Sequence, residues 1–187
     1  MNENIWNDEN LIKVLNENDV VVMPTDTIYG IVGKAFNKDV VERIYKIRER
    51  SPDKPCIILI GNIDELNKFS VVLSKKQKEI TKEYWPGPVS VILDCPDDSF
   101  KYLHRGTKTL AFRLPLSEFL QNLLLKTGPL LAPSANKEGI TPALNIKEAK
   151  KYFGNSIDLY IDGGELKGEA SKLIKLNNGN SIIVLRE

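Results

Sequence analysis

The chain has 187 residues, a length typical of one domain, and its 42% hydrophobic and 27% charged residues are typical of a soluble protein with a sizeable core. This composition excludes a largely disordered chain, and the longest apolar runs, Cys56–Ile60 and Ile182–Leu185, are far shorter than the ~20 residues of a membrane-spanning helix. With 26 basic and 25 acidic residues the net charge is +1, so we expect any contact with RNA to be local.

Hydrophobic spacing predicts helices and short strands in the first half of the chain. A helix capped by Asn7 or Asp8 is expected to run to about Asn18, and Asn37 caps an amphipathic helix predicted over 38–50. The other elements expected here are a strand at Val20–Met23 that Pro24 ends, a buried strand at Cys56–Ile60, and a helix from the cap Ser74 to about Trp85.

The second half continues the alternation of strands and helices. Its predicted strands are Val89–Leu93, Thr109–Leu114, Leu130–Ala132, Asp158–Ile161, Leu173–Leu176 and Ile182–Leu185, and its predicted helices are Leu116–Lys126 and Asn145–Phe153. Such alternation predicts an α/β fold built on a twisted, mixed sheet. No repeat, low-complexity tract or long linker interrupts it, so one domain over 1–187 is expected.

Cysteine and histidine are scarce, which limits the possible chemistry. Cys56 and Cys95 have no CxxC spacing, and Cys56 opens an apolar run, so we interpret it as a small buried hydrophobic residue. His104 is the single histidine, so a His-rich zinc site is excluded and no metal ligand is predicted. The polar N-terminus has no signal-peptide pattern, and we expect a cytoplasmic protein whose thiols stay reduced.

Three polar motifs stand at the ends of predicted strands, where open α/β sheets bind ligands. Pro24–Gly30 (PTDTIYG) follows a strand and offers three hydroxyl groups to a small polar ligand, although a Thr-rich turn would look the same. Gly33–Ala35 resembles the end of a phosphate-binding loop. The full pattern of such a loop fails, because residue 28 is Ile instead of Gly and residue 35 is Ala instead of Ser or Thr.

The second motif is a group of basic residues, and the third is a pair of small polar residues. Arg48, Arg50 and Lys54 place three cations within seven residues, as a triphosphate requires, but cations also favour a solvated helix end. Ser134 and Asn136 would face the same side of an extended segment, or they could cap a loop.

Further candidates are Thr109, Ser171, Arg186 and Arg113. Arg113 lies within an apolar strand, so it needs a partner or an anionic ligand.

Taken together and in this order, these segments resemble the YrdC-like threonylcarbamoyl-AMP synthases over essentially the whole chain. The matching segments are Val21–Gly30, Arg48–Pro55, Trp85–Ser90 (WPGPVS), Ser134–Asn136 and Arg186. Five ordered matches are far more specific than any one of them.

The resemblance implies a fold and a reaction. The expected fold is a three-layer α/β domain with a twisted sheet of mixed parallel and antiparallel strands flanked by helices. The expected enzyme is a nucleotidyltransferase that converts L-threonine, bicarbonate and ATP, with Mg²⁺, to L-threonylcarbamoyl-AMP and pyrophosphate. A tRNA threonylcarbamoyl-transferase complex would then use this product to modify tRNA. The chain ends just past its last strand, so we expect the short form of the family.

The resemblance also suggests roles for the candidate residues. The expected catalytic residues are Arg48, Arg50, Ser134 and Asn136. Those expected to bind the nucleotide are Arg48, Arg50, Lys54, Thr109, Ser134, Asn136 and Arg186, and those expected to bind threonine are Thr25, Arg113 and Ser171, with Arg113 on the carboxylate.

Three positions depart from the family pattern. Arg48 replaces a usual lysine, for which Lys46 could be a displaced equivalent. Glu138 stands where a serine often follows the Ser-x-Asn element, and Lys172 stands where a threonine often follows Ser171.

Two rival functions remain open. One is a module that binds structured RNA such as tRNA or double-stranded RNA, because 101–113 contains Lys101, Arg105, Lys108 and Arg113 without an acidic residue. The other is a carbamoyl-transfer domain of a larger maturation enzyme, which the lack of zinc-finger cysteines and of a second domain disfavours.

Overall fold

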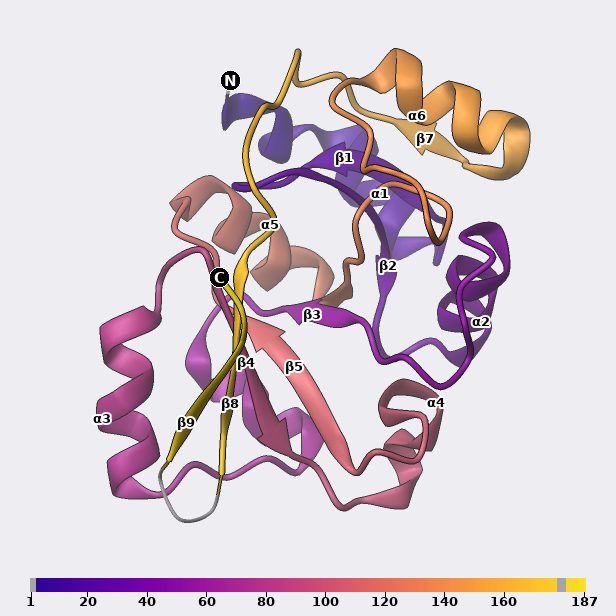
Figure 1. The fold of residues 1–187 in the computed structure, drawn as a ribbon. Coiled ribbons are helices and arrows are strands. Elements are labelled where there is room, and N and C mark those ends of the chain that lie inside the picture. The colour runs from indigo at the N-terminus through magenta and orange to yellow at the C-terminus, as the bar shows by residue number, and fades with distance from the viewer. Residues whose placement is uncertain (1–2, 178–180) are drawn as a thin grey trace.

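A computed structural model describes residues 3–177 and 181–187, and in it the strands form one mixed sheet (Figure 1). The strand order is β7-β1-β2-β6-β3-β5-β4-β8-β9. The strands are β1 (Val21–Pro24), β2 (Tyr29–Lys34), β3 (Ile57–Leu59), β4 (Val89–Asp94), β5 (Thr109–Arg113), β6 (Leu130–Leu131), β7 (Leu159–Tyr160), β8 (Lys172–Leu176) and β9 (Ile182–Arg186). The pairs β1–β7, β3–β5 and β4–β8 are parallel, and the other neighbours are antiparallel.

Helices cover the sheet on two sides, as the three-layer expectation requires. The helices are α1 (Glu9–Asn16), α2 (Lys38–Ile47), α3 (Lys75–Tyr84), α4 (Lys101–His104), α5 (Glu118–Thr127) and α6 (Ile146–Phe153), with short 3-10 turns η1 (Glu3–Asn7), η2 (Ile63–Phe69), η3 (Asp98–Phe100) and η4 (Gly154–Ser156). Apolar side chains of η1, α1 and α5 pack on the face that carries Val21 and Leu59. Those of α2, α6 and η2 pack on the opposite face, which carries Val22 and Ile58. Burial of these two apolar layers stabilises the fold.

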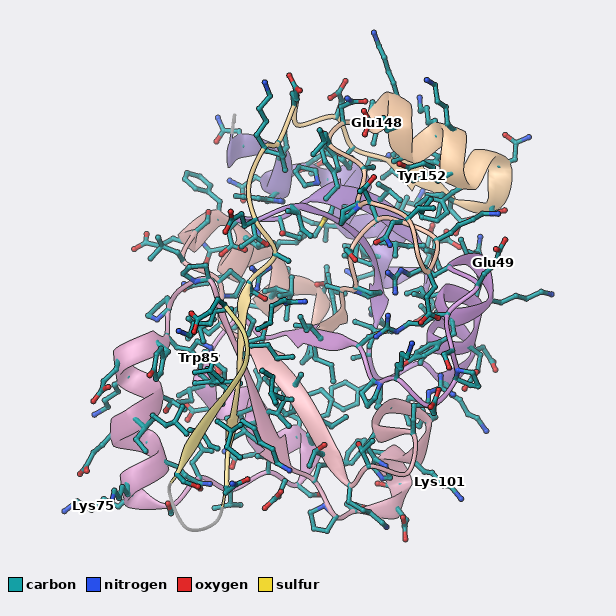
Figure 2. All side chains as sticks on the ribbon, in the orientation of Figure 1. Glu49, Lys75, Trp85, Lys101, Glu148 and Tyr152 are labelled. Carbon is teal, nitrogen blue, oxygen red and sulfur yellow. The ribbon has the colours of Figure 1, made fainter. Side chains whose placement is uncertain are left out.

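The helix starts follow the capping residues in the sequence. Asp8, Asn37, Ser74 and Asn145 each accept a backbone N–H at the first turn of α1, α2, α3 and α6, and Ser74 forms a reciprocal capping box with Gln77. In Figure 2, the labelled Lys75 projects from the start of α3 away from the sheet. The sequence therefore predicts where these helices begin.

Helix α2 is shorter than the 38–50 expected from its spacing. Glu49 has φ 50°, Arg50 N–H bonds to Tyr45 O, and Glu49 N–H bonds to Lys46 O. These two bonds form a Schellman motif, which closes a helix around one left-handed residue. That position usually holds glycine, so a glutamate there gives no stop signal, and the chain turns toward the sheet at Arg48.

Strand β2 is the one strand of the described sheet that was not expected. Tyr29 and Gly30 belong to the PTDTIYG motif, and Gly33 and Lys34 belong to the failed phosphate loop, but the whole strand pairs with β1 and β6. Gly33 lies under α2, because a Cβ there would be 2.4 Å from Val40 Cγ1. The glycine lets helix and strand approach closely.

The WPGP segment joins three strands near the site. Trp85 Nε1–H donates to Val89 O, Gly87 N–H donates to Leu114 O, and Lys172 N–H donates to Pro88 O. The Trp85–Pro86 peptide is cis. The segment therefore aligns the ends of β4, β5 and β8.

Among the described residues no helix is long and apolar enough to cross a bilayer.

Candidate active site

Two adjoining hollows contain almost all the residues that the sequence singled out. The large hollow, about 430 Å³, is lined by Arg48, Arg50, Asp53, Lys54, Pro55, Cys56, Ile57, Ile92, Thr107, Thr109, Ala111, Pro133, Ser134, Leu173 and Arg186. The small hollow, about 60 Å³, is lined by Thr25, Thr27, Ile28, Tyr29, Gly30, Ile57, Arg113, Ala132, Ser134, Ala170, Ser171 and Arg186. Ile57, Ser134 and Arg186 line both, so the two hollows adjoin at these three residues.

Arg48 lies at the wall of the large hollow and is 2% exposed. Its Nε donates to Asn136 O at 3.0 Å, and its Nη2 donates to Asn136 Oδ1 at 3.1 Å and to Ser134 Oγ at 3.2 Å. Its Nη1 is buried and has no hydrogen-bond partner among the described residues. Burial, helped by the nearby Arg50, lowers the pKa of the guanidinium, which is the mark of a cation short of anionic partners.

Asn136 positions other side chains rather than lining either hollow. Its amide donates to Lys137 O and Ile140 O at 2.8 Å, and its Oδ1 accepts from Ser134 Oγ at 2.6 Å as well as from Arg48. Ser134 pairs with Gly30 of β2 in an isolated antiparallel bridge. The structure thus brings Ser134 to the hollows, with Asn136 behind it.

The turn after α2 holds the other two expected cations. Arg50 donates from Nε to Lys54 O and from Nη2 to Pro55 O, both at 3.1 Å. Lys54 Nζ is 2.5 Å from Glu138 Oε1, so its charge is paired. Lys46 lies in a different hollow with Arg43 and Tyr152, away from these residues. The position of Lys46 argues against its being the displaced family lysine.

Arg113 rises from β5 into the small hollow and is 4% exposed. Its Nη1 donates to Thr27 Oγ1 at 2.8 Å, and its Nη2 lies 3.0 Å from Asp26 Oδ1. Burial lowers its pKa, Asp26 opposes that effect, and the charge of Arg186 adds to it. Nε is buried without a hydrogen-bond partner among the described residues. The Nε–H of Arg113 is therefore unused, while Nη1 and Nη2 are held by protein groups.

Thr25 stabilises a turn, which is the alternative interpretation of the Pro24–Gly30 motif. Its hydroxyl donates to Ile28 O at 2.7 Å and accepts from the N–H groups of Thr27 and Ile28 at 3.3 Å. It is 3% exposed and still lines the small hollow. The hydrogen bonds of the Thr25 side chain are those of a turn, as the alternative interpretation predicts. Thr25 also lines the small hollow.

Ser171, Arg186 and Thr109 complete the expected set. Arg186 Nε and Nη2 donate to Ser171 O at 3.0 and 2.6 Å, and Ser171 Oγ lies 2.8 Å from Ser90 Oγ. Thr109 Oγ1 bonds to Thr107 Oγ1 at 3.2 Å at the rim of the large hollow. The last strand thus reaches both hollows through Arg186.

Sequence reasoning missed several residues at the site. Thr27 and Tyr29 are among the three hydroxyl residues of the PTDTIYG motif but are not individual site candidates in the sequence analysis, and Asp26 of the same motif has no expected role. Tyr29 accepts from Gly163 N–H and donates to Gly164 O, both at 2.8 Å, and so ties the segment before Ser171 to the site. Thr107 gave no signal in the sequence. In the described part of the chain no three His, Cys, Asp or Glu side chains gather as a metal site would need.

Comparison with known proteins gives a consistent result. The family profile Sua5_yciO_yrdC, described as "Telomere recombination", matches residues 13–187. The threonylcarbamoyl-AMP synthase of Bacillus subtilis is 34% identical over 153 residues, which are 81% of this chain and 44% of that protein. The synthase of Pyrococcus abyssi is 29% identical over 91% of this chain and 51% of its own length. This chain spans about half the length of these relatives.

Solved structures support the same relationship. The crystal structure of P. abyssi Sua5 complexed with L-threonine superposes with a TM-score of 0.87 and 28% identity over 97% of this chain and 54% of that one. E. coli YciO gives a TM-score of 0.84 and 25% identity over 99% of this chain and 89% of that one. With the profile matching from residue 13 to the end and these folds superposing throughout, the chain belongs to the Sua5/YciO/YrdC family.

Proposed function

We propose that this chain makes L-threonylcarbamoyl-AMP and pyrophosphate from L-threonine, bicarbonate and ATP. The observation that carries the proposal is the pair of joined hollows, one large and rich in cations and one small and lined by hydroxyls and an arginine. The names of the relatives, and the threonine in the Sua5 complex, support the same reading.

The large hollow suits a nucleoside triphosphate. Ile57, Ile92, Ala111 and Leu173 offer an apolar surface for a base, and Arg48, Arg50 and Lys54 in the same lining offer cations for the phosphates. Arg186 and Thr109 are further nucleotide contacts. Mg²⁺ would arrive with the triphosphate, and Asp53 provides an oxygen ligand of the kind that this ion prefers.

The small hollow suits a small amino acid. Thr25 and Ser171 offer hydroxyl partners, and the unused Nε–H of Arg113 is a donor for a carboxylate. Because Ser134 and Arg186 line both hollows, the amino acid would lie next to the nucleotide.

Catalysis would then consist of positioning and charge stabilisation. The amine of threonine and bicarbonate form a C–N bond and release water, which gives a carbamate, and one of the carbamate oxygens attacks the α-phosphate. A new P–O bond forms, the bond to the β-phosphate oxygen breaks, and pyrophosphate leaves with that electron pair. Arg48, Arg50 and Lys54 stabilise the charge on the phosphates, and Ser134 and Asn136 keep Arg48 in place. The product would pass to a tRNA threonylcarbamoyl-transferase complex.

The binding of structured RNA is the weaker candidate. Of the basic residues in 101–113, Arg105 pairs with Glu42 and stacks on Tyr45, Lys108 pairs with Asp98, and Arg113 is buried. Three of the four basic residues of this segment are therefore already paired or buried. Tight, strongly salt-dependent RNA binding without ATP turnover would favour this function instead.

Pyrophosphate release from ATP tests the proposal. We expect release only when threonine and bicarbonate are both present, and little with serine or glycine, because a site built around a substrate group discriminates against its absence. Equal release without an amino acid would contradict the threonine assignment.

A further inference from the structure

Glu138 lies where the expected phosphate-binding cations meet the segment of Ser134 and Asn136. Its Oε1 is 2.5 Å from Lys54 Nζ, and its Oε2 accepts from Ser51 N–H, also at 2.5 Å. Its own N–H donates to Arg48 O at 2.9 Å. One carboxylate thus contacts the turn that carries Arg48, Arg50 and Lys54.

The charge of Glu138 opposes the function proposed for that turn. Its pKa is lowered, first by the hydrogen bond from Lys54 and then by the bond from Ser51 N–H, so the group is ionised at neutral pH. Its negative charge neutralises Lys54 and would repel a phosphate that approaches the same ammonium. Lys54 is 57% exposed and Glu138 is 28% exposed, so the pair is in contact with water and separates at small cost.

We propose that Glu138 is an exchangeable counter-ion of Lys54, which a phosphate group of ATP or pyrophosphate replaces on binding. This inference rests on the proposed function, since it takes a polyphosphate as the ligand of the large hollow. Glu138 weakens the binding of polyphosphates and so speeds the release of pyrophosphate. It is a positioning residue, because it acts through Lys54.

A second ion pair between the same two segments supplies a matched control. Lys137 Nζ pairs with Glu49 Oε1. Lys137 directly precedes Glu138 in the sequence, and Glu49 lies at the end of α2. Glu49 and Lys137 line the hollow that contains Lys46 and Tyr152, not the large hollow. Figure 2 labels Glu49 at the end of α2 and Tyr152 on α6 beside it. Glu49→Gln therefore removes one negative charge from an ion pair between the same two segments, and neither residue of that pair lines the large hollow.

The test is titration calorimetry of wild type, Glu138→Gln and Glu49→Gln with pyrophosphate, ATP and adenosine. Glutamine keeps an acceptor for Ser51 N–H and removes only the charge. We expect Glu138→Gln to bind pyrophosphate and ATP about threefold to fivefold more tightly, the upper range for an exposed ion pair. Its affinity for adenosine should not change, and raising the salt concentration should reduce the gain. Glu49→Gln should bind all three ligands like wild type.

Four outcomes would overturn the inference. Unchanged or weaker polyphosphate binding by Glu138→Gln would show that Glu138 does not compete for Lys54. An equal gain in Glu49→Gln would show a general charge effect, and an equal change for adenosine would show a rearranged pocket. If wild type binds neither ATP nor pyrophosphate, the proposed function fails, and the inference fails with it.

Discussion

At the scale of the single residue, Arg48 joins the two halves of the proposed phosphate site. It is 2% exposed, and it bonds to Ser134 and Asn136 while Nη1 has no hydrogen-bond partner in the described chain. We expect Arg48→Ala to lower kcat/KM for ATP by about 100-fold to 1,000-fold, the range for loss of one preorganised donor. Steady-state pyrophosphate release measures this effect.

Lys46→Ala is the matched control for Arg48. Lys46 lies in the separate hollow with Arg43 and Tyr152, so its loss should leave turnover unchanged. Full activity in Arg48→Ala together with loss in Lys46→Ala would contradict the assignment of Arg48 to the phosphates.

Ser134 and Asn136 should differ in what their loss does to the protein. Asn136 is 7% exposed, and its amide and its Oδ1 each have two partners. Asn136→Ala leaves buried groups unpaired, so we expect it to lower the free energy of unfolding by about 1–3 kcal/mol as well as turnover. Ser134→Ala should lower turnover at nearly wild-type stability. Urea unfolding and kinetics of both variants check this, and equal stability losses would contradict it.

At the scale of the element, the segment 161–171 depends on one close backbone approach. A Cβ on Gly168 would lie 2.2 Å from Thr27 O, and Tyr29 holds Gly163 and Gly164 nearby. Gly168→Ala should displace the segment from the small hollow and lower kcat/KM by about 100-fold, because misplacement by about 1 Å has that effect. The melting temperature should fall little.

The neighbouring exposed residue provides the control. Glu169→Ala adds no such clash, so its kinetics should match wild type. Wild-type kinetics in Gly168→Ala would mean that this segment does not shape the small hollow.

The elements could be predicted where the sequence carries a local signal. Asn37, Ser74 and Asn145 are good N-caps, and the helices begin directly after them. The end of α2 could not be predicted, because Glu49 occupies the left-handed position where glycine is the usual signal. Strand β2 could not be predicted, because it begins with the Tyr-Gly pair of the PTDTIYG motif, whose composition is typical of a turn.

At the scale of the whole molecule, an ion pair links α2 to the sheet edge. Asp158 bonds to Arg43 Nη1 at 2.5 Å and to Val20 N–H at 2.8 Å. The hydrogen bond from Arg43 is the main reason that the pKa of Asp158 is lowered in the folded state. A lowered folded-state pKa adds stability above the unfolded-state value, about 3.9, and this stability is lost as pH falls toward the folded-state value.

Asp158→Asn should therefore matter most at neutral pH. We expect it to lower the free energy of unfolding at pH 7, with a difference from wild type that shrinks as pH falls below about 4. Glu17→Gln, which removes an exposed pair with Lys13, should change little at either pH. Denaturant unfolding across this range checks the sign, and a difference that grows on acidification would contradict it.

The residues that line the site could largely be predicted from the sequence, but the side-chain contacts among them could not. Arg48, Ser134 and Arg186 lie around one hollow although they are far apart in the sequence. No local pattern shows that Glu138 pairs with Lys54, because this contact depends on how two distant loops fold together. A single domain over 1–187 and the role of each site residue stay predictions.

The most direct test of the central claim is mass spectrometry of the adenylate formed from ATP, L-threonine and ¹³C-bicarbonate. We predict an AMP adduct of threonine that carries one ¹³C, in equal amount to the pyrophosphate released, and its absence when either threonine or ATP is left out. ATP cleavage without this labelled adduct, or an adduct of threonine and AMP that carries no ¹³C, would contradict the account.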